Sequence, residues 1–125
     1  MLFFKCDKCG NFITFLGNKS GCTPECCGET MKEITPNTVD AAVEKHVPDV
    51  TVAGNKVTVK VGSVEHPMMA EHYIQFIILE TENGFKKVDL KPGDVPCAEF
   101  LLADGEKAVA AYEYCNLHGL WKKDL

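Results

Sequence analysis

The chain has 125 residues, of which 46% are hydrophobic, and it carries a formal charge of −5. This length fits one domain, or one domain with a small appendage, and the hydrophobic content suffices for a packed core. An acidic chain without a long basic run is not expected to bind nucleic acid, and its apolar runs are too short to span a membrane. The opening residues also lack the apolar stretch of a signal peptide, so we expect a cytoplasmic protein.

The distribution of cysteine and histidine divides the chain in two. Seven cysteines are unusual for a cytoplasmic protein, and an odd number cannot form a complete set of disulfides, so metal binding is the more common use. Five of the seven lie within residues 1–27, whereas all four histidines lie beyond residue 45. This separation predicts two distinct sites in two domains.

The first 35 residues are short apolar pieces between turns rich in glycine and cysteine. A module this short cannot bury enough surface to fold alone, and such modules usually need a metal or disulfides. Four thiols, a C-x-x-C pair followed by two adjacent cysteines, can bind iron or zinc tetrahedrally: Cys6, Cys9, Cys26 and Cys27. A redox-active C-x-x-C or a set of free thiols is the alternative. Cys22 could replace Cys26 or Cys27, but we treat Cys22 and Cys97 as spare thiols.

A short helix and then a series of strands are predicted after Pro36. Asn37 or Thr38 can cap a helix through residues 41–44, and Pro48 prevents its continuation. From residue 49 onward, short alternating runs are separated by turns at residues 54–55, 83–84, 92–93 and 104–105. Six or seven strands with few helices fit a small antiparallel β-sandwich of the immunoglobulin type.

The histidines of this second part lie at strand ends or in loops, and none lies within an apolar run. They are His46, His66, His72 and His118, the last in a Cys-x-x-His pair with Cys115. A lone histidine is usually a surface or hydrogen-bonded residue, but four imidazoles and one thiolate could converge on one metal. Five protein ligands with an open sixth position differ from structural zinc sites, which close at four ligands. Such a set suits a six-coordinate redox metal that binds a small substrate.

At these residues the chain resembles desulfoferrodoxin, the two-iron form of superoxide reductase. Residues 1–35 resemble the desulforedoxin-type domain in "KCDKCGN" and "CCGETMK". Residues 36–125 resemble the superoxide reductase (neelaredoxin-like) domain, in "NTVDAAVEKHVP", "VKVGSVEHPM", "EHYIQFI", "LKPGD" and "YCNLHGLW".

The resemblance implies two iron ions per chain. The first would be held by Cys6, Cys9, Cys26 and Cys27. The second would have His46, His66, His72 and His118 as equatorial ligands and Cys115 as the axial ligand. The implied activity is the one-electron reduction of superoxide to hydrogen peroxide, with a rubredoxin or a similar reduced protein as electron donor. A homodimer is also expected, because a short appendage on a sandwich suggests a shared N-terminal module.

Glu44 and Lys45 directly precede the ligand His46. From composition alone they would be a solvated charge pair at a helix end. The resemblance instead implies that Glu44 binds the free position of ferric iron after product leaves, and that Lys45 attracts the superoxide anion and helps to deliver a proton.

Three other functions are compatible with these residue types. A non-catalytic iron protein for electron transfer would have closed sites, and a zinc protein would be colourless. A superoxide dismutase would release oxygen without needing an external reductant.

Overall fold

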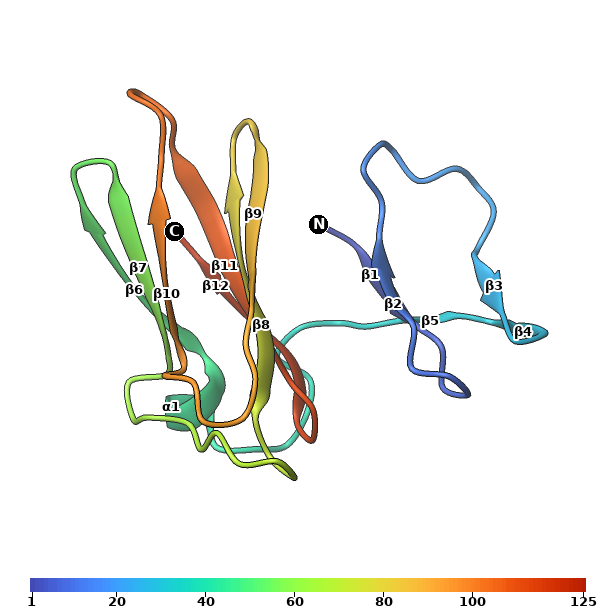
Figure 1. Ribbon diagram of the computed structural model, residues 1–125. Coiled ribbons are helices and arrows are strands. Elements are labelled where there is room, and N and C mark those ends of the chain that lie inside the picture. The colour runs from blue at the N-terminus through green and yellow to red at the C-terminus, as the bar shows by residue number, and fades with distance from the viewer. The chain divides into compact units, whose positions relative to one another are not determined.

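The computed structural model describes all residues of the chain, from Met1 to Leu125 (Figure 1). The chain forms two compact units, Met1–Thr35 and Pro36–Leu125. None of its helices has the length and apolar character needed to cross a membrane.

The first unit consists of very short strands around a small core. Strand β1 (Phe3–Lys5) pairs antiparallel with β2 (Phe12–Thr14) and with β5 (Lys32–Glu33), and β3 (Glu25–Cys26) pairs with β4 (Glu29–Thr30). Its buried cluster contains Phe4, Cys6 and Met31. So few buried side chains contribute little to stability, which agrees with the expectation that this unit depends on a metal.

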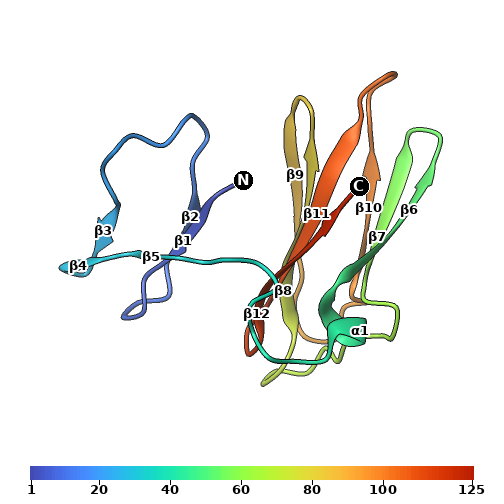
Figure 2. The same ribbon diagram turned by 180° about the vertical axis from the view of Figure 1, so that it is seen from behind.

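The second unit is an antiparallel β-sandwich, which confirms the predicted fold class. Its elements are α1 (Val43–His46), β6 (Pro48–Ala53), β7 (Lys56–Val61), β8 (Ile74–Thr81), β9 (Gly84–Asp89), β10 (Cys97–Leu101), β11 (Ala108–Cys115) and β12 (Gly119–Asp124). One sheet has the strand order β10-β7-β6 and the other β12-β11-β8-β9, as Figures 1 and 2 show from opposite sides.

The core between these sheets follows from the sequence pattern. In β7 the valines at alternate positions, Val57, Val59 and Val61, are fully buried, whereas Lys60 is exposed. They pack in one cluster with Ile77 and other apolar residues of β8, β10 and β11. The cluster therefore holds the two sheets together face to face.

Strands β10 and β11 are consecutive in the chain but belong to different sheets. β10 pairs with β7, and β11 pairs with β8 and β12. The turn at Asp104–Gly105 therefore joins the two sheets and does not close a hairpin. Alternation of apolar residues predicts both strands, but it does not specify their partners.

The predicted start of the helix is wrong. The helix begins at Val43, its N-cap is Ala42, and no side chain caps it. Asn37 adopts a positive φ of 61° and pairs with β12 instead: its Oδ1 accepts from Lys122 N–H at 2.8 Å, and its Nδ2 donates to Lys122 O at 3.1 Å. This contact satisfies the backbone N–H and carbonyl groups of Lys122 in β12, and it fixes the segment that leads to the helix.

The segments that carry the histidines meet at one end of the sandwich. Helix α1, the loop from residue 62 to residue 73, and the turn between β11 and β12 all lie at the lower end of the sandwich in Figure 1. Sequence positions far apart are thus brought together there.

Candidate metal centres

Five side chains converge at this end of the sandwich. His46 ends α1, Cys115 ends β11, and His118 lies in the turn before β12, while His66 and His72 come from the loop before β8. One nitrogen or sulfur atom from each of the five lies within 4.8 Å of the corresponding atom of every other. The structure therefore brings together all five residues that the sequence analysis singled out for this site.

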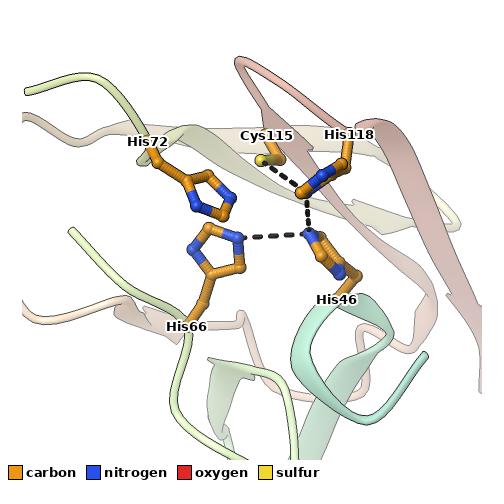
Figure 3. Close-up of side chains that lie close together, drawn as sticks. All are labelled: His46, His66, His72, Cys115 and His118. Atoms are coloured by element: carbon orange, nitrogen blue, oxygen red, sulfur yellow. Dashed lines mark hydrogen bonds between the residues drawn. The ribbon is translucent and has the colours of Figure 1, made fainter. Parts of the chain in front are cut away.

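The four imidazoles form a closed ring around a common space, with the sulfur of Cys115 beside it (Figure 3). Neighbouring ring centroids are 4.6–4.9 Å apart, and each ring stands at 74–90° to its two neighbours. The sulfur of Cys115 lies 3.9 Å from Nδ1 of His118. This arrangement directs ring nitrogens, not ring faces, toward the centre.

Hydrogen bonds to the backbone fix the tautomers of two rings. Nδ1 of His46 lies 2.7 Å from the carbonyl oxygen of Ala42, and Nδ1 of His66 lies 2.6 Å from that of Pro67. Each Nδ1 therefore carries the proton, which leaves a lone pair on each Nε2. The two Nε2 atoms lie 3.1 Å apart, yet neither has a proton to donate to the other. A cation between the rings satisfies both lone pairs.

The electrostatics of the site also favour a bound cation. Burial lowers the pKa of His66 to about 4 and lowers the pKa of His46 and of His72, so the rings are kept neutral. Nε2 of His72 is buried and has no hydrogen-bond partner. Neutral imidazoles with free lone pairs are metal ligands. The donor set therefore fits a metal ion.

The thiol of Cys115 is fully buried, and burial raises its pKa. Backbone N–H groups of Leu117 and His118 point at the sulfur and oppose that effect. A bound cation would supply the remaining stabilisation of the thiolate.

Trp121, which the sequence analysis did not assign to the site, supports two of the ligands. Its indole stacks on the ring of His46 at a centroid distance of 5.0 Å and an angle of 25°. Its Nε1–H donates to the backbone carbonyl of His118 at 3.0 Å. The only tryptophan of the chain stands three residues after a candidate ligand, which was the one signal in the sequence that could have identified it.

Glu113 is a second buried group near the site that the sequence analysis missed. It lies in β11 two residues before Cys115, it is wholly buried, and neither of its side-chain oxygens has a hydrogen-bond partner. Burial raises its pKa well above the ordinary value, which favours the neutral, protonated form. Nothing in the sequence around Glu113 predicts that this carboxyl side chain is buried.

Glu44 and Lys45 are both exposed in α1, next to His46. The backbone carbonyl of Glu44 accepts from the N–H of Val64 at 2.9 Å and from the hydroxyl of Ser63 at 3.3 Å. The pKa of His72 is lowered first by burial, then by the charges of His118 and Lys45. The charge of Glu71 raises the pKa of His72 and so opposes the effect of Lys45.

The second group of candidate ligands lies in the first unit: Cys6, Cys9, Cys26 and Cys27, with sulfur atoms within 4.8 Å of one another. Cys22 and Cys97 lie outside both groups. The sulfur atoms of Cys9 and Cys26 are 3.5 Å apart, and those of Cys26 and Cys27 are 3.9 Å apart. Cys27 has a positive φ of 54°, which allows two adjacent side chains to contribute to one site.

These four thiols interact strongly in the absence of a cation. A hydrogen bond from the backbone N–H of Cys9 lowers the pKa of Cys6 to about 7. Hydrogen bonds with Cys9, Cys26 and Cys6 raise the pKa of Cys27 to about 12. The four sulfurs therefore cannot all ionise together unless a cation compensates them, as in a four-thiolate iron or zinc site.

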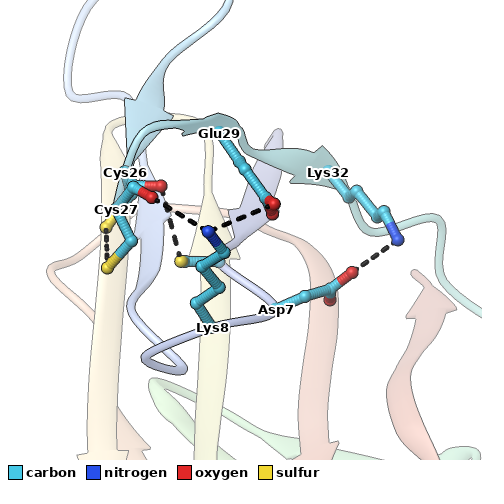
Figure 4. A network of polar contacts seen from close by, with 7 residues as sticks. Asp7, Lys8, Cys26, Cys27, Glu29 and Lys32 are labelled. Atoms are coloured by element: carbon cyan, nitrogen blue, oxygen red, sulfur yellow. Dashed lines mark hydrogen bonds and ion pairs between the residues drawn. The ribbon is translucent and has the colours of Figure 1, made fainter.

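A network of charged side chains flanks this group (Figure 4). Lys8 Nζ donates to the carbonyl oxygen of Cys27 at 3.5 Å and lies 3.3 Å from Glu29, and Lys32 lies 2.5 Å from Asp7. These ion pairs are exposed and contribute little to stability. The two contacts of Lys8 join the C-x-x-C turn to the segment that carries Cys26 and Cys27.

The chain is similar in sequence to known proteins of one family. The sequence profile of the Desulfoferrodoxin family matches residues 38–124. The chain is 46% identical over 121 residues to a desulfoferrodoxin of Syntrophotalea carbinolica, covering 97% of this chain and 94% of that one. It is 33% identical over 108 residues to a superoxide reductase of Pyrococcus furiosus, covering 66% of this chain and 87% of the other.

Solved structures of superoxide reductases have a similar fold. The crystal structure of the enzyme from Treponema pallidum matches with a TM-score of 0.81 and 38% identity, over 98% of this chain and 97% of that chain. The superoxide reductase (1Fe-SOR) of Giardia intestinalis matches with a TM-score of 0.57 and 38% identity, over 66% of this chain and 97% of the other. By the family profile and by relatives that match almost its whole length, this chain belongs to the desulfoferrodoxin family.

Proposed function

We propose that the protein is a superoxide reductase with two iron ions per chain. The observation that carries this proposal is the group of four imidazoles and one thiolate whose donor atoms lie within 4.8 Å of one another. Five ligands exceed the four of a closed zinc site, and they leave a six-coordinate metal one position for a substrate. Similar proteins that carry the name superoxide reductase support the same activity.

The ligands of the catalytic iron would be His46, His66, His72, His118 and Cys115. Iron held there supplies one electron, which together with two protons converts superoxide into hydrogen peroxide. The chain keeps three of these rings neutral by burial, and the carbonyls of Ala42 and Pro67 hold the protons of two rings on the side away from the centre. The thiolate of Cys115 would donate electron density to a bound iron ion and so favour its oxidised state.

Lys45 provides local positive charge for an anionic substrate. The chain as a whole has a formal charge of −5, so its overall field repels superoxide. Lys45 is exposed and directly precedes the candidate ligand His46 in the chain, and its charge lowers the pKa of His72 against the opposing effect of Glu71. Its ammonium group attracts the anion and is a source of one of the two protons.

Glu44 acts after the product leaves. Its carboxylate is exposed beside His46, while its own backbone carbonyl is held by Ser63 and Val64. With iron bound, the carboxylate of Glu44 would occupy the free ligand position of the oxidised ion and exclude other anions. A carboxylate is a ligand that a ferric ion prefers over a ferrous one, because the ferric ion carries more charge.

The other iron would be held by Cys6, Cys9, Cys26 and Cys27. We assign residues 1–35 as a desulforedoxin-like iron domain and residues 36–125 as the superoxide reductase domain, in line with the two compact units. Because the apolar core of the first unit is small, a metal held by these four cysteines would stabilise its fold.

Several further assignments follow from the same proposal. The electron donor is a rubredoxin or a similar reduced protein, because each turnover consumes one electron. The protein acts in the cytoplasm, where thiols remain reduced, and it forms a homodimer through its short N-terminal module. Redox titration with purified rubredoxin and sedimentation analysis would test the donor and the dimer.

Stopped-flow mixing of the anaerobically reduced protein with superoxide tests the activity. A superoxide reductase oxidises its iron in a fast second-order step and yields hydrogen peroxide. A non-catalytic electron-transfer protein has no free ligand position, so azide or ferrocyanide would leave its ferric spectrum unchanged. A zinc protein would be colourless and inert.

A further inference from the structure

The two ligands of the loop from residue 62 to residue 73 are fixed in different ways. The ring of His66 is held by its hydrogen bond to the carbonyl of Pro67. The ring of His72 has no such bond, and its Nε2 is buried without a partner. The position of the His72 backbone therefore determines where its ring lies.

Asn116 contacts the backbone on both sides of His72. Its N–H donates to the carbonyl oxygen of Tyr73 at 3.2 Å, and its Oδ1 accepts from the N–H of Tyr73 at 2.9 Å. Its Nδ2 donates to the carbonyl oxygen of Glu71 at 3.0 Å. The residues directly before and after His72 are thus both bound to one side chain.

The same asparagine follows Cys115 directly in the chain. The regular pairing of β11 with β8 shifts between Tyr114 and Cys115, and beyond this shift one backbone bond remains, from the N–H of Asn116 to the carbonyl oxygen of Tyr73. The side-chain amide of Asn116 adds one acceptor and one donor to this backbone bond. Within the loop, the N–H of Met69 donates to the carbonyl oxygen of His72 at 2.9 Å and the N–H of His72 donates to that of Met69 at 3.1 Å. Asn116 connects this local turn to the end of β11.

We propose that Asn116 is a positioning residue of the iron site, which ties His72 to Cys115 and so fixes two ligands from different strands relative to one another. This inference rests on the proposed iron site and adds a residue that contacts neither metal nor substrate. Neither aspartate, which lacks the donor, nor leucine, which lacks both groups, can make the two side-chain bonds. Groups that orient metal ligands typically change metal affinity by about 10-fold to 100-fold when removed.

Asn37 offers a matched control within the same unit. Its side chain makes the same pair of bonds to the backbone of Lys122, a residue that is not a candidate ligand. Asn116→Ala and Asn37→Ala therefore each remove one donor and one acceptor. The Asn37 variant also strains a position with φ of 61°, so it should lose at least as much stability.

The test uses the iron-loaded full chain. It measures how fast a chelator removes iron from the site of four histidines and one cysteine, and the visible absorption of that site reports the loss of iron. We expect Asn116→Ala to release this iron about tenfold faster or more, and Asn37→Ala to stay within about twofold of wild type. The absorption of the four-cysteine iron serves as an internal reference and should not change. Equal release rates in wild type and Asn116→Ala would overturn the proposal. Asn116→Ser removes the same two bonds and replaces the alanine variant if that variant does not fold.

A double-mutant cycle with His72→Ala tests whether Asn116 acts through His72. In the His72→Ala background, Asn116→Ala should change the rate of iron release by less than about twofold, because the ligand it positions is gone. A full additional effect in that background would overturn the assignment and leave Asn116 as a general structural residue. Wild-type protein that binds no iron at this site would refute the proposed function itself. Equal release rates in wild type and Asn116→Ala, or a full additional effect in the His72→Ala background, would refute only the role of Asn116.

Discussion

A methyl group at Gly62 tests how closely the loop after β7 must approach the helix that carries His46. A Cβ atom at this position would lie 2.7 Å from the carbonyl oxygen of Glu44 and 2.9 Å from that of Val47. Both contacts are to backbone, which cannot turn away as a flexible side chain can. The helix must therefore move by about 0.7 Å to restore ordinary contact, since packed interiors have no spare space.

We expect Gly62→Ala to destabilise the second unit by about 2 kcal/mol, the usual cost of overpacking, which lowers its melting temperature by about 10 °C. Because the displaced helix carries Glu44, Lys45 and His46, the reaction with superoxide should slow by about tenfold. Differential scanning calorimetry and stopped-flow spectroscopy of the iron-loaded protein measure these two effects. Gly21→Ala is the control, because a Cβ there has no atom within 4 Å. A Gly62→Ala protein with wild-type melting temperature and rate would refute the close packing described here.

Three further predictions concern the two centres. Cys9→Ser should remove the iron of the first unit and its spectrum while leaving superoxide reduction largely intact, and Cys115→Ser should do the reverse. Metal analysis measures both effects. Loss of both irons in either variant would show that the ligands have been assigned to the two sites incorrectly. Lys45→Ala should slow the second-order reaction with superoxide about tenfold at low salt, with a gap that narrows as salt rises, and Lys45→Arg should retain most of the rate if charge alone matters. Pulse radiolysis across ionic strength measures this, and equal rates at low salt would assign steering to another group. Glu44→Ala should leave the first encounter with superoxide nearly unchanged but alter the ferric spectrum and admit azide; an unchanged spectrum would remove Glu44 from the mechanism.

The sequence predicted the elements whose signals are local. Alternating valines and the turn at Gly54–Asn55 give the hairpin of β6 and β7, whose strands pair from Pro48↔Val61 to Ala53↔Lys56. The candidate ligands could also be named, because cysteine and histidine at such spacings are rare in chains without metals. Local composition was therefore sufficient for strands, turns and donor atoms.

What the sequence did not predict depends on contacts between distant residues. Asn37 looked like a helix cap, but it binds Lys122, 85 positions away, and the helix begins without a side-chain cap. The residues that support the ligands were missed for the same reason: Trp121 stacks on His46, and Asn116 binds both neighbours of His72. No periodicity encodes such pairs, because they form only when the sandwich closes.

The stoichiometry of superoxide consumption tests the central claim most directly. Reduced, iron-loaded protein should be mixed with superoxide under anaerobic conditions, with hydrogen peroxide, oxygen and oxidised iron measured together. A superoxide reductase yields one hydrogen peroxide and one oxidised iron for each superoxide consumed, and it releases no oxygen. Half an equivalent of hydrogen peroxide accompanied by oxygen would instead indicate a dismutase. No reaction at the site of His46, His66, His72, His118 and Cys115 would contradict the proposed function.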